Sequence, residues 1–98
     1  MSDKLMGRDV FRPHNDPARA IYDAFQAEAS KRDERDTEEW LKKEPEAVWR
    51  AACDYAKAHG LQEPTLAQVE RAERYAQGSS DYGAQWAYAL VRYMVPLN

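Results

Sequence analysis

Hydrophobic residues recur at three- and four-residue steps along most of the chain, a spacing that is typical of amphipathic helices. The first such stretch covers residues 17–31. Asp16 is placed to cap it, and Pro17 fits its first turn, where no hydrogen-bond donor is lost. Its apolar stripe consists of Ala18, Ile21, Tyr22, Phe25 and Ala29. Residues 1–15 have no such period, so we expect an irregular N-terminal arm before a single helical domain over residues 16–98.

Mixed charges without an apolar face fill residues 31–36, which predicts a solvated connector. Asp36 and Glu39 then have the spacing of a capping box, so we expect a short helix that ends near Lys43. The acidic side chains of this stretch are interpreted as a solvated polar face: Glu38, Glu39, Glu44 and Glu46.

Pro45 lacks a backbone N–H and would clash with the preceding helical turn, so we expect the chain to restart there. The following helix is predicted to end at Gly60, because glycine favours the left-handed conformation of a C-cap. Its apolar stripe consists of Val48, Trp49, Ala52, Tyr55, Ala56 and His59. The next helix begins with a capping box of Thr65 and Gln68 and ends at Gly78. Its apolar positions are Leu66, Val69, Ala72 and Ala76.

The last helix is predicted to follow a cap supplied by one of residues 79–81 and to run to about Met94, before Pro96. No stretch alternates between apolar and polar positions as a strand would, and no segment repeats. The sequence therefore predicts an all-α fold, a small bundle of four to five helices with the irregular N-terminal arm.

This last helix is apolar around nearly its whole circumference, since only Gln85 and Arg92 are strongly polar between Tyr82 and Val95. One side carries Tyr82, Trp86, Ala89, Leu90 and Tyr93. The other side carries Ala84, Ala87, Tyr88, Val91 and Val95. Two interpretations stay open: the helix is the centre of the bundle, or its second side packs against another protein chain.

The second interpretation predicts a non-enzymatic protein-interaction module. Its partner-binding residues are Tyr88, Val91 and Val95 on the outward side of the last helix, together with Val10 and Phe11 of the arm. Burying such a side chain at an interface contributes roughly 1.5 to 3 kcal/mol before ordering costs. We therefore expect a protein partner or self-association, with a homodimer as the expected assembly.

The net charge of −3 is spread over the chain without a basic patch, which argues against a nucleic-acid partner. Residues 56–78 nevertheless offer an alternative, a DNA-binding regulator of the helix-turn-helix kind. The pattern consists of Ala56, Gly60, Leu66 and Val69. Its predicted turn is long and its charges sum to zero, so it departs from that motif in two ways.

Arg71 and Arg74, next to Tyr75, give a second alternative, a binder of small nucleotides or anions. This function requires an oligomer that brings two copies of the pair together across a symmetry axis. The structural interpretation of the same residues is a surface pair balanced by Glu70 and Glu73.

The sequence contains no motif that is typical of catalysis or metal binding. Cys53 and His59 are six residues apart on one predicted helix, which turns their side chains away from each other. We interpret Cys53 as a small core residue and His59 as a residue that suits a helix C-terminus. Only His14 could join His59, and no cluster has metal-ligand spacing. We therefore expect no enzymatic activity, no metal and no cofactor.

The longest apolar run, residues 86–91, has six residues, whereas a bilayer span needs about twenty. The first residues lack the apolar block of a secretory signal, and the single cysteine excludes an intrachain disulfide. These observations favour a cytoplasmic protein that does not enter a membrane.

Residues 78–88, GSSDYGAQWAY, together with residues 12–17, RPHNDP, resemble short helical proteins that are encoded by bacteriophages and prophages. The resemblance brings no catalytic motif. It implies a cytoplasmic accessory protein that acts on a bacterial or phage component by binding. Inhibitors of host defence, including anti-CRISPR proteins, are one group of such proteins and are often small, acidic and helical.

Overall fold

The computed structural model describes residues 13–34 and 36–97, and these residues form an all-α bundle of four helices, as the sequence predicts. The elements are α2 (Asp16–Ala29), a 3₁₀ turn (Arg32–Glu34), α3 (Thr37–His59), α4 (Leu66–Ala76) and α5 (Tyr82–Val91). In this part of the chain, β pairing is limited to one isolated bridge between Leu61 and Pro96.

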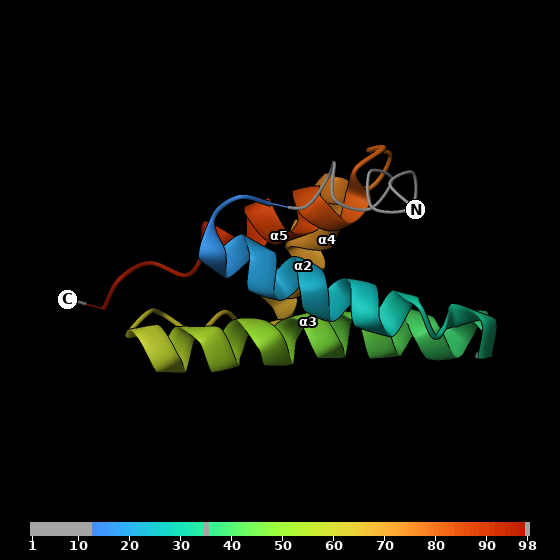
Figure 1. Ribbon diagram of the computed structural model, residues 1–98, viewed down its shortest axis with the longest axis horizontal. Helices are drawn as coiled ribbons and strands as arrows, with labels where there is room; N and C mark the ends of the chain where they lie inside the picture. The colour runs from blue at the N-terminus through green and yellow to red at the C-terminus, as the bar shows by residue number, and fades with distance from the viewer. Residues whose placement is uncertain (1–12, 35, 98) are drawn as a thin grey trace, which may run out of the picture.

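The helices pack around α2, which lies between α3 on one side and α5 on the other (Figure 1). α4 packs against α5 and also contacts α3, so the four helices enclose one core. The largest fully buried side chains are those of Trp86, Ile21, Leu90, Val48, Val69 and Pro13. Small alanines on every helix fill the remaining core and allow the helices to approach closely.

The start of α2 differs by one residue from the prediction. Asn15, rather than Asp16, is the N-cap, and its side-chain oxygen accepts a hydrogen bond from the Ala18 amide at 2.8 Å. Asp16 instead occupies the first turn, where its negative charge interacts favourably with the helix dipole. Within the predicted arm, Pro13 is buried and its backbone oxygen accepts a hydrogen bond from Arg19, whereas His14 and Asn15 are exposed.

The predicted break at Pro45 is wrong, because α3 continues through this residue as one helix. The missing N–H of Pro45 leaves the Leu41 carbonyl without its helical donor. Leu41 is exposed, so water can take the place of that donor. On the opposite side of the same turn, Glu44 and Val48 are buried against the rest of the bundle. Packing of Glu44, which precedes Pro45, and of Val48, which follows it, therefore keeps the helix continuous.

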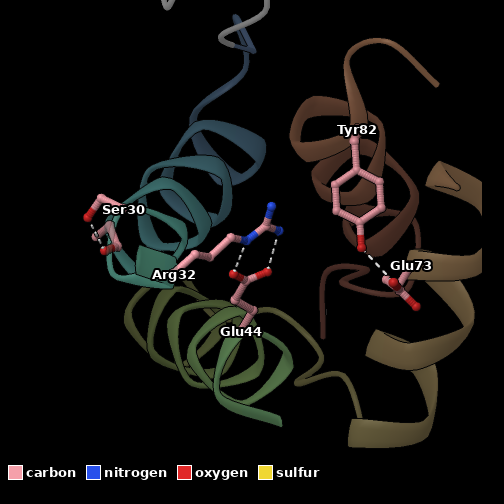
Figure 2. A network of polar contacts seen from close by, with 6 residues as sticks. Ser30, Arg32, Glu44, Glu73 and Tyr82 are labelled. Carbon is pink, nitrogen blue, oxygen red and sulfur yellow. Dashed lines mark hydrogen bonds and ion pairs between the residues drawn. The ribbon is translucent and has the colours of Figure 1, made fainter. Parts of the chain in front are cut away.

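Arg32 and Glu44 form a bidentate ion pair that the sequence interpretation missed (Figure 2). The guanidinium donates to the two carboxylate oxygens at 2.6 and 2.7 Å and lies 4.3 Å from the centre of the Trp40 ring. Glu44 is only 2% exposed, so the expectation that it belongs to a solvated face is wrong. Arg32 likewise is half-buried, and the predicted solvated connector bends back onto α3. Residues twelve positions apart cannot be paired from local periodicity.

Two helix ends follow their local signals closely, whereas α4 ends at Ala76, two residues before the predicted Gly78, and Asp81 precedes α5 without the predicted side-chain cap. Thr65 and Gln68 form the predicted capping box at the start of α4. Gly60 ends α3 with a φ of 68°, the left-handed conformation that glycine adopts without strain. α5 ends at Val91, before the predicted residue 94, because the Tyr93 and Met94 amides bond to carbonyls three residues earlier.

The rotation of α5 about its own axis is set by one close approach to α2. The Phe25 ring packs over Gly83 and contacts both Tyr82 and Trp86, with ring centres 5.6 and 5.4 Å away. On the α4 side, the Trp86 indole donates to the backbone oxygen of Val69 at 3.0 Å. These contacts turn one side of α5 inward and leave the opposite side facing solvent.

We predict that Gly83→Ala destabilises the fold. A Cβ at this position would lie 2.8 Å from two atoms of the buried Phe25 ring and 3.1 Å from Tyr22. Overpacking of this kind costs about 1 to 3 kcal/mol. This cost exceeds the gain of about 1 kcal/mol that alanine brings to a helix interior. Urea unfolding measures the loss, and adding Phe25→Leu should make it smaller; an additive double variant would contradict the proposed clash.

A second prediction concerns the ion pair. Arg32→Met leaves the buried Glu44 carboxylate unpaired and should lower the free energy of unfolding by about 3 kcal/mol, the lower end for such losses because Arg32 is 40% exposed. The double variant Arg32→Met, Glu44→Leu removes both charges and should recover most of this loss. Denaturant titration of wild type, the single variant and the double variant measures their free energies of unfolding. Equal stability of the single and double variants would show that the unpaired carboxylate is not the cause.

Candidate functional site

A groove on the surface between α4 and α5 is lined mainly by tyrosines. Its lining residues are Tyr75, Gln85, Tyr88, Ala89, Arg92 and Tyr93, and we call it the tyrosine groove. The hollow has a volume of about 370 Å³. Tyr75 comes from the last turn of α4, whereas the other five residues come from α5 and the turn that follows it.

Packing of the two helices places the tyrosines at the rim of this groove. Trp86, Ala87 and Leu90 are buried on the side of α5 that faces the core. Tyr88 lies on the other side of the helix and therefore faces outward. Tyr88 is 37% exposed and Tyr75 is 74% exposed. The small, half-buried side chain of Ala89 also lines the groove. The groove thus combines exposed aromatic side chains with a small apolar one.

The structure separates the partner-binding residues that the sequence predicts. Tyr88 lies at the groove, whereas Val91 is half-buried against the core. Val95 is 54% exposed, but it belongs to the C-terminal segment, where its carbonyl accepts from the Gln62 amide. The two remaining residues of this set, Val10 and Phe11, lie outside the described residues.

The assignment of two sides to the last helix is only partly right. Ala84 and Ala87 were placed on the same side as Tyr88, but both are buried. α5 is shorter than predicted and is covered by both α2 and α4, so its inward surface is wider than a helical projection indicates. The side that remains outside is narrow and is centred on Tyr88.

Tyr75 is the most exposed aromatic residue of the groove, and the sequence interpretation did not assign it to the partner-binding surface. The sequence indicates the exposure of Tyr75, because this residue lies off the apolar stripe of its own helix. A large aromatic side chain at such a position points away from the core and is exposed. The sequence does not indicate that Tyr75 lies close to Tyr88, because this depends on how α4 and α5 pack.

Arg71 and Arg74 are exposed on α4 and are not part of the groove lining. Neither forms an ion pair within residues 13–34 and 36–97. The Glu73 carboxylate, which was expected to balance them, instead accepts a hydrogen bond from the Tyr82 hydroxyl at 2.5 Å. The groove itself contains one charged side chain, that of Arg92.

The bond between Tyr82 and Glu73 joins α5 to α4 near the Arg32–Glu44 pair (Figure 2). Burial raises the pKa of the Tyr82 hydroxyl above its usual value, and the hydrogen bond to the Glu73 carboxylate raises this pKa further. Tyr82 is therefore a donor at neutral pH. Because both carboxylates of this cluster are engaged by donors, the cluster is suited to holding helices together rather than to moving protons.

Cys53 is half-buried on α3, and its thiol lies 3.6 Å from the Pro64 carbonyl, to which it donates. Burial raises the pKa of this thiol, and the negative charge of Glu63 adds to the effect. A protonated, hydrogen-bonded thiol is a weak nucleophile. His59 does not approach it, because its ring stacks on Tyr55 with centres 4.0 Å apart.

The described residues also bear on metal binding, membrane insertion and the helix-turn-helix alternative. They contain no group of three or more side chains that could hold a metal ion, and no helix among them is long and apolar enough to cross a membrane. α3 and α4 are joined by residues 60–65, a longer connection than the three or four residues of a helix-turn-helix.

Comparison of the chain with models of protein families, with curated proteins and with solved structures finds no match.

The hydrogen bond of Tyr82 leads to a prediction with a defined pH dependence. Tyr82→Phe should lower the free energy of unfolding by about 1 to 3 kcal/mol at pH 7, because Glu73 loses its donor. The pKa of Tyr82 is raised in the folded state, so its contribution is complete below about pH 10, the usual tyrosine pKa. The contribution is lost as the pH rises above that value.

Urea unfolding of wild type and Tyr82→Phe at a series of pH values from 7 to the alkaline range measures this effect. The difference in stability between the two proteins should shrink with rising pH. The exposed Tyr75→Phe serves as the control, since it should change stability little at any pH. A difference that is independent of pH would contradict the role of the Tyr82 proton.

Proposed function

We propose that this chain is a non-enzymatic protein-interaction module that binds its partner through the tyrosine groove. The observation that carries the proposal is the pair of exposed tyrosines, Tyr75 of α4 and Tyr88 of α5, that line one groove. Tyrosine and arginine are enriched among the residues that contribute most to binding at protein interfaces. The groove contains three tyrosines and Arg92.

The energetics of the groove suit protein binding. Tyr75 and Tyr88 both belong to helices that are packed into the bundle, so their backbones are ordered before a partner arrives. Preorganised aromatic side chains lose little conformational entropy on binding. Burying a fully exposed side chain of this size contributes roughly 1.5 to 3 kcal/mol, of which Tyr88, at 37% exposure, supplies a part and Tyr75, at 74%, a larger part. Together the two side chains favour association with a protein surface.

The resemblance of residues 78–88 and 12–17 to phage and prophage proteins supplies the biological setting of the proposal. In this setting the chain is a phage-encoded accessory protein of the bacterial cytoplasm. It acts on a bacterial protein by binding, as inhibitors of host defence do. Its activity then depends on occupying a surface of the target, and no residue of the module takes part in bond chemistry.

The proposal predicts that Tyr88→Glu lowers the affinity for the bound protein at least tenfold, or about 1.4 kcal/mol. A carboxylate in the covered groove would have to lose its hydration without gaining a partner. The matched control is Leu41→Glu, an exposed apolar residue of α3 outside the groove lining, which should leave the affinity unchanged.

The experiment captures proteins from the source cell with tagged wild type and both variants. A recovered protein is identified by mass spectrometry, purified, and titrated against each form of the module. Retention of full affinity by Tyr88→Glu, with a melting curve like that of wild type, would show that the groove is not the contact surface.

A further inference from the structure

Four side chains form a straight line along the outer side of α5: Asp81, Gln85, Tyr88 and Arg92. Their spacing of four, three and four residues keeps them on one side of a helix. Asp81 precedes α5 but belongs to this line, because its backbone carbonyl accepts from the Gln85 amide at 3.0 Å. Its carboxylate also accepts from the Gln85 side chain at 3.0 Å. We call this line the α5 stripe.

The α5 stripe carries opposite charges at its two ends. Asp81 is negative and lies before the first turn, whereas Arg92 is positive and follows the last turn. The ten residues of α5 lie between them, and the eleven steps from Asp81 to Arg92 correspond to roughly 16 Å. Neither residue forms an ion pair in the part of the chain that the structure describes. Gln85 and Tyr88, both exposed, occupy the uncharged middle.

This order of charges is complementary to itself. A rotation of 180° about an axis through the middle of the stripe brings a second stripe into antiparallel contact with the first. Asp81 of each copy then faces Arg92 of the other, and Tyr88 of each copy lies beside Gln85 of the other. A parallel arrangement would place like charges together, which is unfavourable at an interface.

We propose that a second copy of this chain occupies the tyrosine groove, with the two α5 helices antiparallel about a twofold axis. The inference rests on the proposed function, because it names the protein surface that covers Tyr88 while no bacterial partner is bound. The second copy and the bacterial partner use the same groove and therefore exclude each other. A twofold interface uses the same patch on both copies, so each residue of the α5 stripe contributes twice. Tyr75 and Tyr93, which also line the groove, flank the contact between the helices.

The charge pattern distinguishes this occupant from others. A partner with a uniformly acidic contact surface would be repelled by Asp81, and a uniformly basic one by Arg92. A partner that satisfies both ends must reverse its charge along the helix, as a second copy does. Tyr88 near the middle adds apolar contact close to the twofold axis, where burial by both copies is greatest.

Two charge reversals test the antiparallel arrangement. In Asp81→Arg both ends of the stripe are positive, and in Arg92→Asp both ends are negative. Each variant alone therefore brings like charges together in the dimer, and its dissociation constant should rise at least tenfold. When the two variants are mixed in equal amounts, every contact pairs opposite charges, so the mixed dimer should regain an affinity close to that of wild type.

Sedimentation equilibrium of wild type, each variant and the equimolar mixture measures these constants. Asp81→Arg also removes the acceptor of Gln85 and places a positive charge at a helix N-terminus, which weakens the helix. The mixture contains the same weakened chains. Recovery of association in the mixture therefore cannot arise from folding, and thermal melts of the separate variants complete the control.

Two outcomes would overturn the inference. A mixture that associates no more tightly than the separate variants excludes the antiparallel contact of the α5 stripes. Wild type that stays monomeric at every concentration excludes the second copy as the occupant. In that case the effect of Tyr88→Glu on a captured bacterial protein still decides the proposed function, so the two failures are distinguishable.

Discussion

The contact of Phe25 with Gly83 is the constraint on which the rest of this structure depends. Because position 83 has no side chain, the Phe25 ring lies directly on α5 and packs against both Tyr82 and Trp86. Gln85 and Arg92 favour one side of α5 for solvent, but the rest of its circumference is apolar and does not by itself fix the rotation of the helix. This single approach fixes the rotation, buries Trp86 and turns Tyr88 toward solvent. The groove and the α5 stripe both follow from it.

Two polar contacts secure the helices around that aromatic cluster. The Arg32–Glu44 pair ties the turn after α2 to α3, and the Tyr82–Glu73 bond ties α5 to α4. Each buries or half-buries a carboxylate, and each supplies the donor that makes the burial tolerable. Among the described residues, no fully buried side-chain nitrogen or oxygen lacks a hydrogen-bond partner. The polar chemistry near the core is therefore engaged in holding the fold.

The sequence correctly indicated helices and many of their ends, because these depend on bonds between residues only a few positions apart. Thr65 and Gln68 cap α4 as their spacing predicts, and Gly60 ends α3 in the left-handed conformation. The same local logic failed at Pro45, where packing of Glu44 and Val48 keeps α3 continuous. In the candidate site, an exposed Tyr88 belonged to one of the two interpretations that the sequence left open, because the apolar residues of the last helix exceed what one buried face can hold.

What the sequence alone determined is the class of fold, the local caps and the excess of apolar surface near the C-terminal end. Periodicity and capping act within about four residues, so they can be recognised directly in the sequence. Only the tertiary structure decided which side of α5 is outside, that Tyr75 lies across the groove from Tyr88, and that Glu44 is buried. These features depend on residues far apart in sequence, such as Phe25 and Gly83, whose contact no local pattern specifies.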